Sequence, residues 1–233
     1  MNLLRSILTD TLHLFYPHNC RGCGTDILQQ PNLLCLKCIN QLPYTSEANH
    51  AANHTENIFV GRLPVQAACC EFFFSKDSLI QRLIHQLKYK GDTEIGFYMG
   101  ELMGKDLLAG GRFSNLDLLM PLPLHPNKER KRGYNQAAII CNGISSVMNV
   151  PVSTGNLVRR RFTETQTRKH RVDRWENVDG SFMINNESVL RGKHILLVDD
   201  VITTGATLES CGQCIINIPA AKLSIAALAY ASK

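Results

Sequence analysis

Residues 192–209 read Gly-Lys-His-Ile-Leu-Leu-Val-Asp-Asp-Val-Ile-Thr-Thr-Gly-Ala-Thr-Leu-Glu, and this stretch decides the fold of the chain. Its apolar run, Ile195–Val198, predicts a buried strand. Two adjacent carboxylates, Asp199 and Asp200, stand where that strand ends, and a small polar turn, Thr203–Thr207, then leads into a helical pattern. This order predicts an α/β protein, in which ligands bind at the carboxyl ends of the strands.

The polar turn has the residue types of an anion site. Successive backbone N–H groups that lead into a helix N-terminus hold anions well. Thr203, Thr204 and Thr207 add hydroxyl donors, and Gly205 lets the backbone approach a ligand closely. The two preceding carboxylates are placed to accept hydrogen bonds from two sugar hydroxyls. The stretch therefore predicts a site for a ribose 5-phosphate.

Three competing assignments fit this stretch less well. A Walker A loop requires Gly-Lys-Ser or Gly-Lys-Thr, and neither follows Gly205. A response-regulator receiver begins with a similar strand, but it needs most of its domain afterwards, and only 33 residues follow Asp200. The third assignment is a buried strand with a solvated turn. Two adjacent carboxylates at a strand end are costly unless solvated or liganded, which favours a binding site.

The composition indicates a folded protein without a membrane span. The length, 233 residues, accommodates about one and a half typical domains, and the 44% apolar fraction supports a hydrophobic core. No apolar run approaches the ~20 residues of a membrane span. Residues Met1–Phe15 place apolar side chains on one helical stripe, which predicts a docking helix and not a signal peptide. We therefore expect a cytoplasmic protein with reduced or metal-bound cysteines.

The positive charge is concentrated in two segments. The net charge is +5, of which Arg159–Arg174 carries +5 and His125–Tyr134 carries +3, so the remainder is net negative. Two basic loops on an otherwise acidic chain suit a small polyanion as well as they suit nucleic acid.

Two Cys-x-x-Cys pairs predict a metal module near the N-terminus. Cys20 and Cys23 form the first pair, and Cys35 and Cys38 form the second, with 11 residues between the pairs. Four thiolates at this spacing give tetrahedral zinc ligation with no open position, so we expect a structural Zn²⁺. Gly22 permits the tight turn that points amide donors at the sulfurs. Four unrelated cysteines in a loop are the alternative.

The other cysteines fit a different role. Cys211 and Cys214 also have Cys-x-x-Cys spacing, but they lie on the helix after the polar turn among apolar residues, so we expect small core residues. Cys69, Cys70 and Cys141 also have the pattern of buried positions.

The chain divides into two expected units. Residues 1–60 comprise the N-terminal helix, the four-cysteine module and a linker, and residues 61–233 form the main domain; the linker is the polar segment Gln41–Gly61. Further patterns predict strands at Ala67–Phe74, Leu116–Met120 and Leu223–Ala231. They also predict helices at Lys76–Tyr89 and Thr93–Leu108, and a third helix that follows the basic loop and continues to Val147.

The chain also resembles known proteins. The run Val198–Thr207 resembles the PRPP motif of type I phosphoribosyltransferases, where PRPP is 5-phosphoribosyl 1-diphosphate. Nearly the whole chain resembles the ComF family, which is phosphoribosyltransferase-like and associated with DNA uptake in competent bacteria. The segments that carry this resemblance are the four-cysteine module, Lys88–Asp92, Arg132–Gln136, Thr163-x-x-Gln166, Arg174-x-x-Asn177 and Asp199–Thr207.

The resemblance implies a fold and a ligand. The fold is a mostly parallel sheet flanked by helices, with a flexible flap, beside the small four-cysteine zinc module. The ligand is PRPP, whose oxygens Mg²⁺ bridges. In the family the acidic pair contacts the ribose hydroxyls and the turn holds the 5-phosphate. The candidate residues here are Asp199, Asp200, Val201, Thr203, Thr204, Gly205, Ala206 and Thr207.

Two basic segments are candidates for holding the diphosphate. The first is a basic loop that follows the strand ending near Met120. The second is Val158–Phe182, which contains the single tryptophan, Trp175, and predicts a flap that excludes water from the site. The candidate cations are Lys128, Arg130, Lys131 and Arg132 in the loop, and Arg171 and Arg174 in the flap. A solvated basic loop without a ligand is the alternative.

Two functions fit these residues. The first is a phosphoribosyltransferase whose acceptor the sequence does not identify. The second is a PRPP-sensing binding protein that contacts single-stranded DNA or a DNA-uptake helicase through the flap and the zinc module. Trp175 and Tyr134 are then candidates to stack on bases, and packing of Trp175 onto the core is the alternative.

Overall fold

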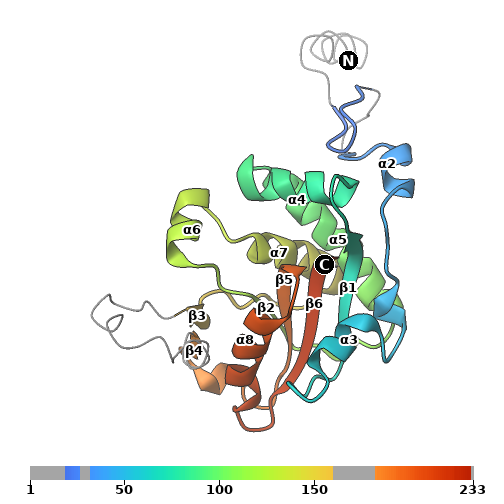
Figure 1. Cartoon of the computed structure of the whole chain (residues 1–233). Coiled ribbons are helices and arrows are strands. Elements are labelled where there is room, and N and C mark those ends of the chain that lie inside the picture. Colours follow the sequence, from blue (N-terminus) through green and yellow to red (C-terminus); the bar gives the residue numbers. More distant parts are fainter. Residues whose placement is uncertain (1–18, 27–31, 160–181, 232–233) are drawn as a thin grey trace, which may run out of the picture.

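The computed structural model describes residues 19–26, 32–159 and 182–231 (Figure 1). The expected N-terminal docking helix lies outside these residues, and so does nearly all of the expected flap. Within the described part, the helices are α2 (Leu36–Asn40), α3 (His54–Phe59), α4 (Leu79–Tyr89), α5 (Thr93–Ala109), α6 (Pro126–Arg132), α7 (Gln136–Met148) and α8 (Ala206–Ile216), with short 3₁₀ turns η1 (Glu47–Asn49) and η3 (Glu187–Val189).

The centre of the fold is a parallel sheet in the order β1-β6-β5-β2. Its strands are β1 (Ala68–Phe74), β2 (Leu118–Pro121), β5 (His194–Ile202) and β6 (Lys222–Ala231), and every neighbouring pair is parallel. Strand β5 is an inner strand, paired with β2 on one side and β6 on the other. The carboxyl ends of all four strands therefore meet at one edge, which is where α/β folds bind ligands.

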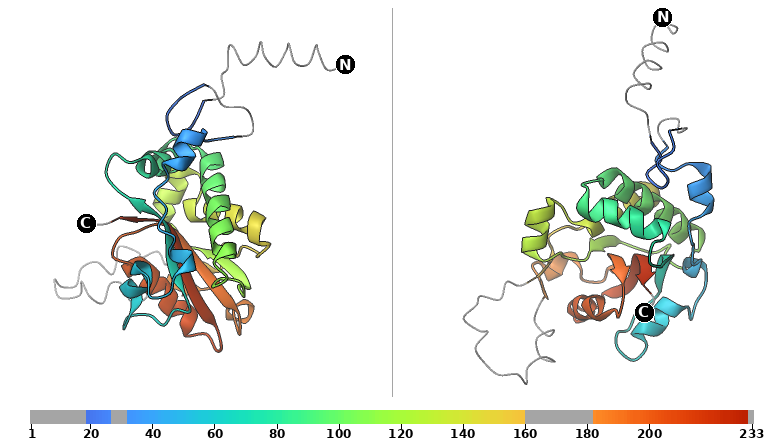
Figure 2. Two further views of the ribbon diagram at one scale, coloured as in Figure 1. Left: turned by 90° about the vertical axis from the view of Figure 1, so that its right-hand side faces the viewer. Right: turned by 45° about the horizontal axis from the view of Figure 1, so that its top comes forward.

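Both faces of the sheet are buried, which explains why β5 is a continuous apolar run and not an alternating one. Leu196 and Val198 belong to a core cluster with α4, α5 and α7. Ile195 and Leu197 belong to a second cluster, with α3 and α8. Successive side chains of a strand point to opposite faces. The helices accordingly form two layers, with α4, α5 and α7 on one face and α3 and α8 on the other (Figures 1 and 2).

Side-chain caps fix the start of the helices that border the site. Ser78 accepts a hydrogen bond from Gln81 N at the start of α4, and Asp92 accepts one from Ile95 N at the start of α5. Asn135 accepts one from Ala137 N at the start of α7, and its amide also donates to Leu122 O at 2.9 Å. These caps satisfy backbone donors that a helix leaves unpaired.

The predicted fold class is confirmed: a parallel sheet is flanked by helices, and the predicted strands and helices around it are present with shifts of a few residues at their ends. Two local expectations were wrong. The basic loop contains a helix, α6, and the polar segment 41–61 contains a packed helix, α3, whose Phe59 is fully buried. Buried Glu47 accepts from Thr55 N and Oγ1 and from Cys70 N, so this segment is attached to strand β1.

A small antiparallel ribbon stands beside the main sheet. Its strands, β3 (Leu157–Arg159) and β4 (Phe182–Ile184), lie on either side of residues 160–181 in the sequence, where the flap is expected. No helix in the described part of the chain is long and apolar enough to cross a membrane.

Candidate functional site

The predicted phosphate turn lies between β5 and α8. Thr203, Thr204, Ala206 and Thr207 are exposed, whereas Gly205 is buried and serves as the N-cap of α8 with a left-handed φ of 73°. Glycine adopts this conformation without strain, and it has no side chain to occupy the first N–H groups of the helix. The turn therefore presents backbone donors, threonine side chains and the positive end of an 11-residue helix on one surface.

The acidic pair lies at the end of β5, directly before this turn. Asp199 and Asp200 are both partly buried, and Asp200 N donates to Asp199 Oδ1 at 2.7 Å. Lys88 Nζ, from the last turn of α4, donates to Asp200 Oδ1 at 2.9 Å. This ion pair joins residues 112 positions apart, and the side chain of Asp200 is only 13% exposed. Val201, the third predicted residue here, is partly buried and packs against the neighbouring core cluster.

The environment raises the pKa of Asp199 to about 8. Burial is the main cause, and the negative charge of Asp200 raises the pKa further. The Asp200 N–H and the Lys88 charge lower it only in part. One carboxyl of the pair is consequently protonated over much of the neutral range, and a protonated carboxyl donates as well as accepts a hydrogen bond.

A basic pocket of about 360 Å³ adjoins the acidic pair. Its lining residues come from the end of α4, from α6 and from the segment after α6: Lys88, Tyr89, Gly91, Lys128, Lys131, Arg132 and Tyr134. Lys88 belongs to both features, because it lines the pocket and bonds to Asp200. The structure thus brings three of the four predicted loop cations together. Arg130 is exposed on α6 and is not among the lining residues.

The segment Gly133–Gln136 holds this pocket in place. Tyr134 Oη donates to Leu87 O on α4, which ties the segment after α6 to the end of α4. Asn135 caps α7, and Gln136 is buried with an amide nitrogen that has no hydrogen-bond partner among the described residues. Lys88, Tyr89 and Tyr134 had no assigned role in the sequence beyond the resemblance and the possible base stacking of Tyr134. Arg171 and Arg174 lie outside the described residues.

The four N-terminal cysteines form a compact group. The sulfur atoms of Cys20, Cys23, Cys35 and Cys38 all lie within 4.8 Å of one another, and the group could hold a metal ion. Cys35 N donates to Cys20 Sγ at 3.3 Å. Burial raises the pKa of Cys20, but N–H donors from Cys35, Cys23 and Gly22 outweigh it and bring the pKa to about 6. Thiolates, which metals bind, are favoured by such donors.

Gly22 is required by the closeness of this packing. A Cβ atom on Gly22 would lie 2.7 Å from Cys38 Sγ. The remaining cysteines are separate from the group: Cys69, Cys70, Cys141 and Cys211 are buried core residues, and Cys214 is partly buried.

Residues 135–233 match the phosphoribosyl transferase domain family, and this range contains α7, β5, the polar turn, α8 and β6. Competence protein F of Haemophilus influenzae is 27% identical, over 94% of this chain and 93% of that protein. These similarities support assignment of the chain to the ComF family. Its fold is accordingly of the phosphoribosyltransferase type, with the cysteine group at the N-terminal side.

Two further relatives of this chain carry another name. The DNA utilization protein YhgH of Escherichia coli O157:H7 is 30% identical over 61% of this chain, and the chain spans 63% of its length. The protein of the same name from Salmonella typhimurium is 28% identical over 88% of this chain and 81% of that protein.

Proposed function

We propose that this protein binds PRPP with Mg²⁺ at the carboxyl edge of its sheet and transfers the phosphoribosyl group to an acceptor. The observation that carries the proposal is the continuity of three features: the glycine-capped turn, the acidic pair and the basic pocket, joined through Lys88. PRPP has a 5-phosphate, two ribose hydroxyls and a diphosphate. The three features have the matching chemistry in that order.

Each part of the ligand has named residues. The N–H groups of Ala206 and Thr207 and the hydroxyls of the turn hold the 5-phosphate. Asp199 and Asp200 hold the ribose hydroxyls, and the protonated carboxyl of the pair also donates. Lys128, Lys131 and Arg132 bind the diphosphate. Mg²⁺, when bound with PRPP, neutralises part of the diphosphate charge.

The reaction breaks the bond between ribose C1 and the diphosphate oxygen. The diphosphate leaves with the electron pair, and an acceptor atom forms the new bond to C1. Negative charge builds on the departing oxygens, and cations fixed around the pocket stabilise it without reorganising. The acceptor's proton is lost to solvent or to a base outside the residues named here.

The names of the relatives supply the biological context. One is called a competence protein and two are called DNA utilization proteins, so we propose a role in DNA uptake or in the nucleotide metabolism that follows it. We further propose that the cysteine group holds a structural Zn²⁺ and that the protein acts in the cytoplasm. The expected units, residues 1–60 and 61–233, share the packing of α3 on the main sheet, so we propose that the cysteine module alone is the separate unit.

The test is calorimetric titration of PRPP with Mg²⁺ into wild type and into the double variant Asp199→Asn/Asp200→Asn. The matched control is Asp77→Asn, which removes a carboxylate at an exposed left-handed position that asparagine tolerates. Micromolar binding that is lost in the double variant and kept in the control supports the proposal. Release of diphosphate with candidate bases or amines then tests turnover. Wild type that does not bind PRPP contradicts the proposal.

A second candidate function is a PRPP-responsive protein that binds single-stranded DNA or a DNA-uptake helicase. The observation that favours DNA is a row of exposed rings beside the basic pocket. The Arg132 guanidinium lies 5.5 Å from the Tyr89 ring centroid, and the His85 and Tyr89 rings are 4.8 Å apart. Such rings stack on bases while neighbouring cations contact phosphates.

Fluorescence anisotropy with a labelled oligonucleotide tests this candidate. Tyr89→Ala should weaken binding of single strands, and wild-type affinity should fall steeply with added salt. Affinity that is independent of salt contradicts phosphate contact, and the helicase then becomes the partner to test.

A further inference from the structure

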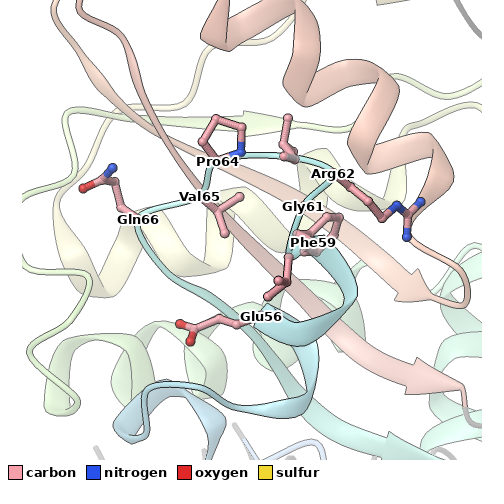
Figure 3. A pocket seen from close by; sticks show the side chains of 9 residues that line it. Glu56, Phe59, Gly61, Arg62, Pro64, Val65 and Gln66 are labelled. Carbon is pink, nitrogen blue, oxygen red and sulfur yellow. The ribbon is translucent and has the colours of Figure 1, made fainter.

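The phosphate turn rests on a segment that precedes the main sheet in the chain. Glu56 and residues 59–66 line a cavity of about 510 Å³, and Phe59, Gly61, Arg62 and Pro64 are among its labelled residues in Figure 3. A Cβ atom on Gly205 would lie 2.8 Å from Ile58 Cγ2 and 3.1 Å from Phe59 Cε1. The end of α3 is therefore the floor of the turn, in direct contact with its buried glycine.

Arg62 ties this floor to the turn by four hydrogen bonds. Its Nη1 donates to Ile58 O and to Thr204 O, both at 3.0 Å. Its Nε donates to Glu209 Oε2 at 3.1 Å, and its Nη2 donates to the same oxygen. In Figure 3 the Arg62 side chain extends toward the connection between β5 and α8. One guanidinium thus joins α3, the turn and the first turn of α8.

The charge of Glu209 explains why an arginine is useful here. Glu209 lies in the first turn of α8, the helix whose N-terminus faces the proposed phosphate position. A carboxylate there stabilises the empty helix but repels a phosphate that approaches the same N–H groups. Arg62 neutralises that carboxylate and holds it on the α3 side. The Thr204 carbonyl, which would also repel a phosphate, is held by the same guanidinium.

We propose that Arg62 is a positioning residue for the 5-phosphate. It keeps the two acceptor groups that border the turn, the Thr204 carbonyl and the Glu209 carboxylate, bonded on the side away from the ligand. The proposal rests on the proposed function and extends it to a residue outside the matched domain range 135–233. Lysine replaces arginine poorly at such a place, because its single ammonium lacks the planar fork that reaches three acceptors.

The experiment compares three probes, PRPP with Mg²⁺, ribose 5-phosphate and inorganic diphosphate, by calorimetry. Arg62→Ala should weaken the binding of PRPP and of ribose 5-phosphate on the order of tenfold, because charge repulsion near a helix N-terminus is of that size. Its affinity for diphosphate, which is expected to bind at the basic pocket and not at the turn, should stay within about twofold. Arg62→Lys should recover part of the loss.

Two further variants separate charge from structure. Arg62→Ala/Glu209→Gln should bind ribose 5-phosphate more tightly than Arg62→Ala, since the uncompensated carboxylate is gone. Arg191→Ala removes an exposed arginine near the opposite end of β5, and it should bind all three probes like wild type. The Arg62 side chain is 36% exposed, so its loss leaves the core intact, and thermal unfolding checks this.

Each outcome decides one point. Equal binding of ribose 5-phosphate by wild type and Arg62→Ala overturns the role of Arg62 and leaves the proposed function standing. An equal loss for all three probes also overturns it, because that pattern reports a general structural defect. Wild type that binds neither PRPP nor ribose 5-phosphate refutes the proposed function and the role of Arg62 together.

Discussion

Replacement of Asp199 with asparagine should stabilise the unliganded protein, and the gain should increase with pH. Asp199 has its pKa raised from 3.8 to about 8, chiefly by burial and then by the charge of Asp200. Asparagine keeps the same shape and retains an oxygen for the hydrogen bond from Asp200 N. The substitution therefore removes the cost of ionising a buried carboxyl with little loss of packing.

The raised pKa of Asp199 determines how stability changes with pH. A carboxyl whose pKa is higher in the folded state lowers stability as pH rises from its unfolded pKa, near 4, to its folded pKa. Each pKa unit corresponds to about 1.4 kcal/mol, so a shift of this size sets a ceiling of roughly 5–6 kcal/mol. Structural relaxation and sharing of the proton with Asp200 make the real difference smaller than this ceiling. We expect Asp199→Asn to raise the free energy of unfolding by about 2–3 kcal/mol at pH 9.

Urea denaturation at pH 5, 7 and 9, in buffer free of Mg²⁺ and phosphate, measures this gain. The free energy of unfolding of Asp199→Asn minus that of wild type should be small at pH 5 and largest at pH 9. The control, Asp77→Asn, shows what the same replacement does at an exposed position. A difference for Asp199→Asn that is constant from pH 5 to 9, or negative throughout, would refute the raised pKa.

Three other predictions concern the turn, the cysteine group and α7. Gly205→Ala should lower the free energy of unfolding in urea by about 1–3 kcal/mol, because φ is 73° and the new Cβ meets Ile58. An unchanged free energy of unfolding contradicts the contact. Cys38→Ser should reduce the zinc content found by elemental analysis and lower the melting temperature, and wild type that purifies without zinc would refute the metal assignment. Gln136→Met should raise the free energy of unfolding by about 1 kcal/mol, because it removes a buried amide nitrogen with no partner in the described residues; a large loss of stability would show that the amide is bonded.

The central sheet and the turn could be predicted because their signals are local. The apolar run before Asp199 is long enough to indicate a strand buried on both faces, and the glycine and threonines after it indicate a turn that begins a helix. The position of the pair Cys20 and Cys23 beside Cys35 and Cys38 also follows from spacing, which keeps two knuckles within reach of one ion.

The contacts that complete the site could not be predicted, because they join residues far apart in sequence. Lys88 reaches Asp200 across 112 positions, and Arg62 reaches Thr204 across 142. Charge and propensity patterns describe one segment at a time, so they do not indicate which lysine of many meets a given carboxylate. Only the packing of α4 and α3 on opposite faces of the sheet brings these two cations to the same edge.

Two helices were missed although local signals were present. Asn53 caps the start of α3 by accepting from Glu56 N, and the Glu56 side chain accepts from Ala52 N, the residue before the cap. Pro126 occupies the first turn of α6, where its fixed φ favours a helix, and His125 caps it. The high polarity of both segments concealed these signals, since neither has the apolar stripe of a long helix.

The inner position of β5 has a consequence for how the site withstands motion. Because β5 is hydrogen-bonded to a strand on each side, its amides can exchange with solvent only through openings that disrupt most of the sheet, whereas edge strands and peripheral helices open far more often. The acidic pair is thus attached to a strand whose amides we expect to exchange slowly. The ribbon β3–β4, whose strands each have one neighbour within the described ranges, should exchange its amides sooner than β5.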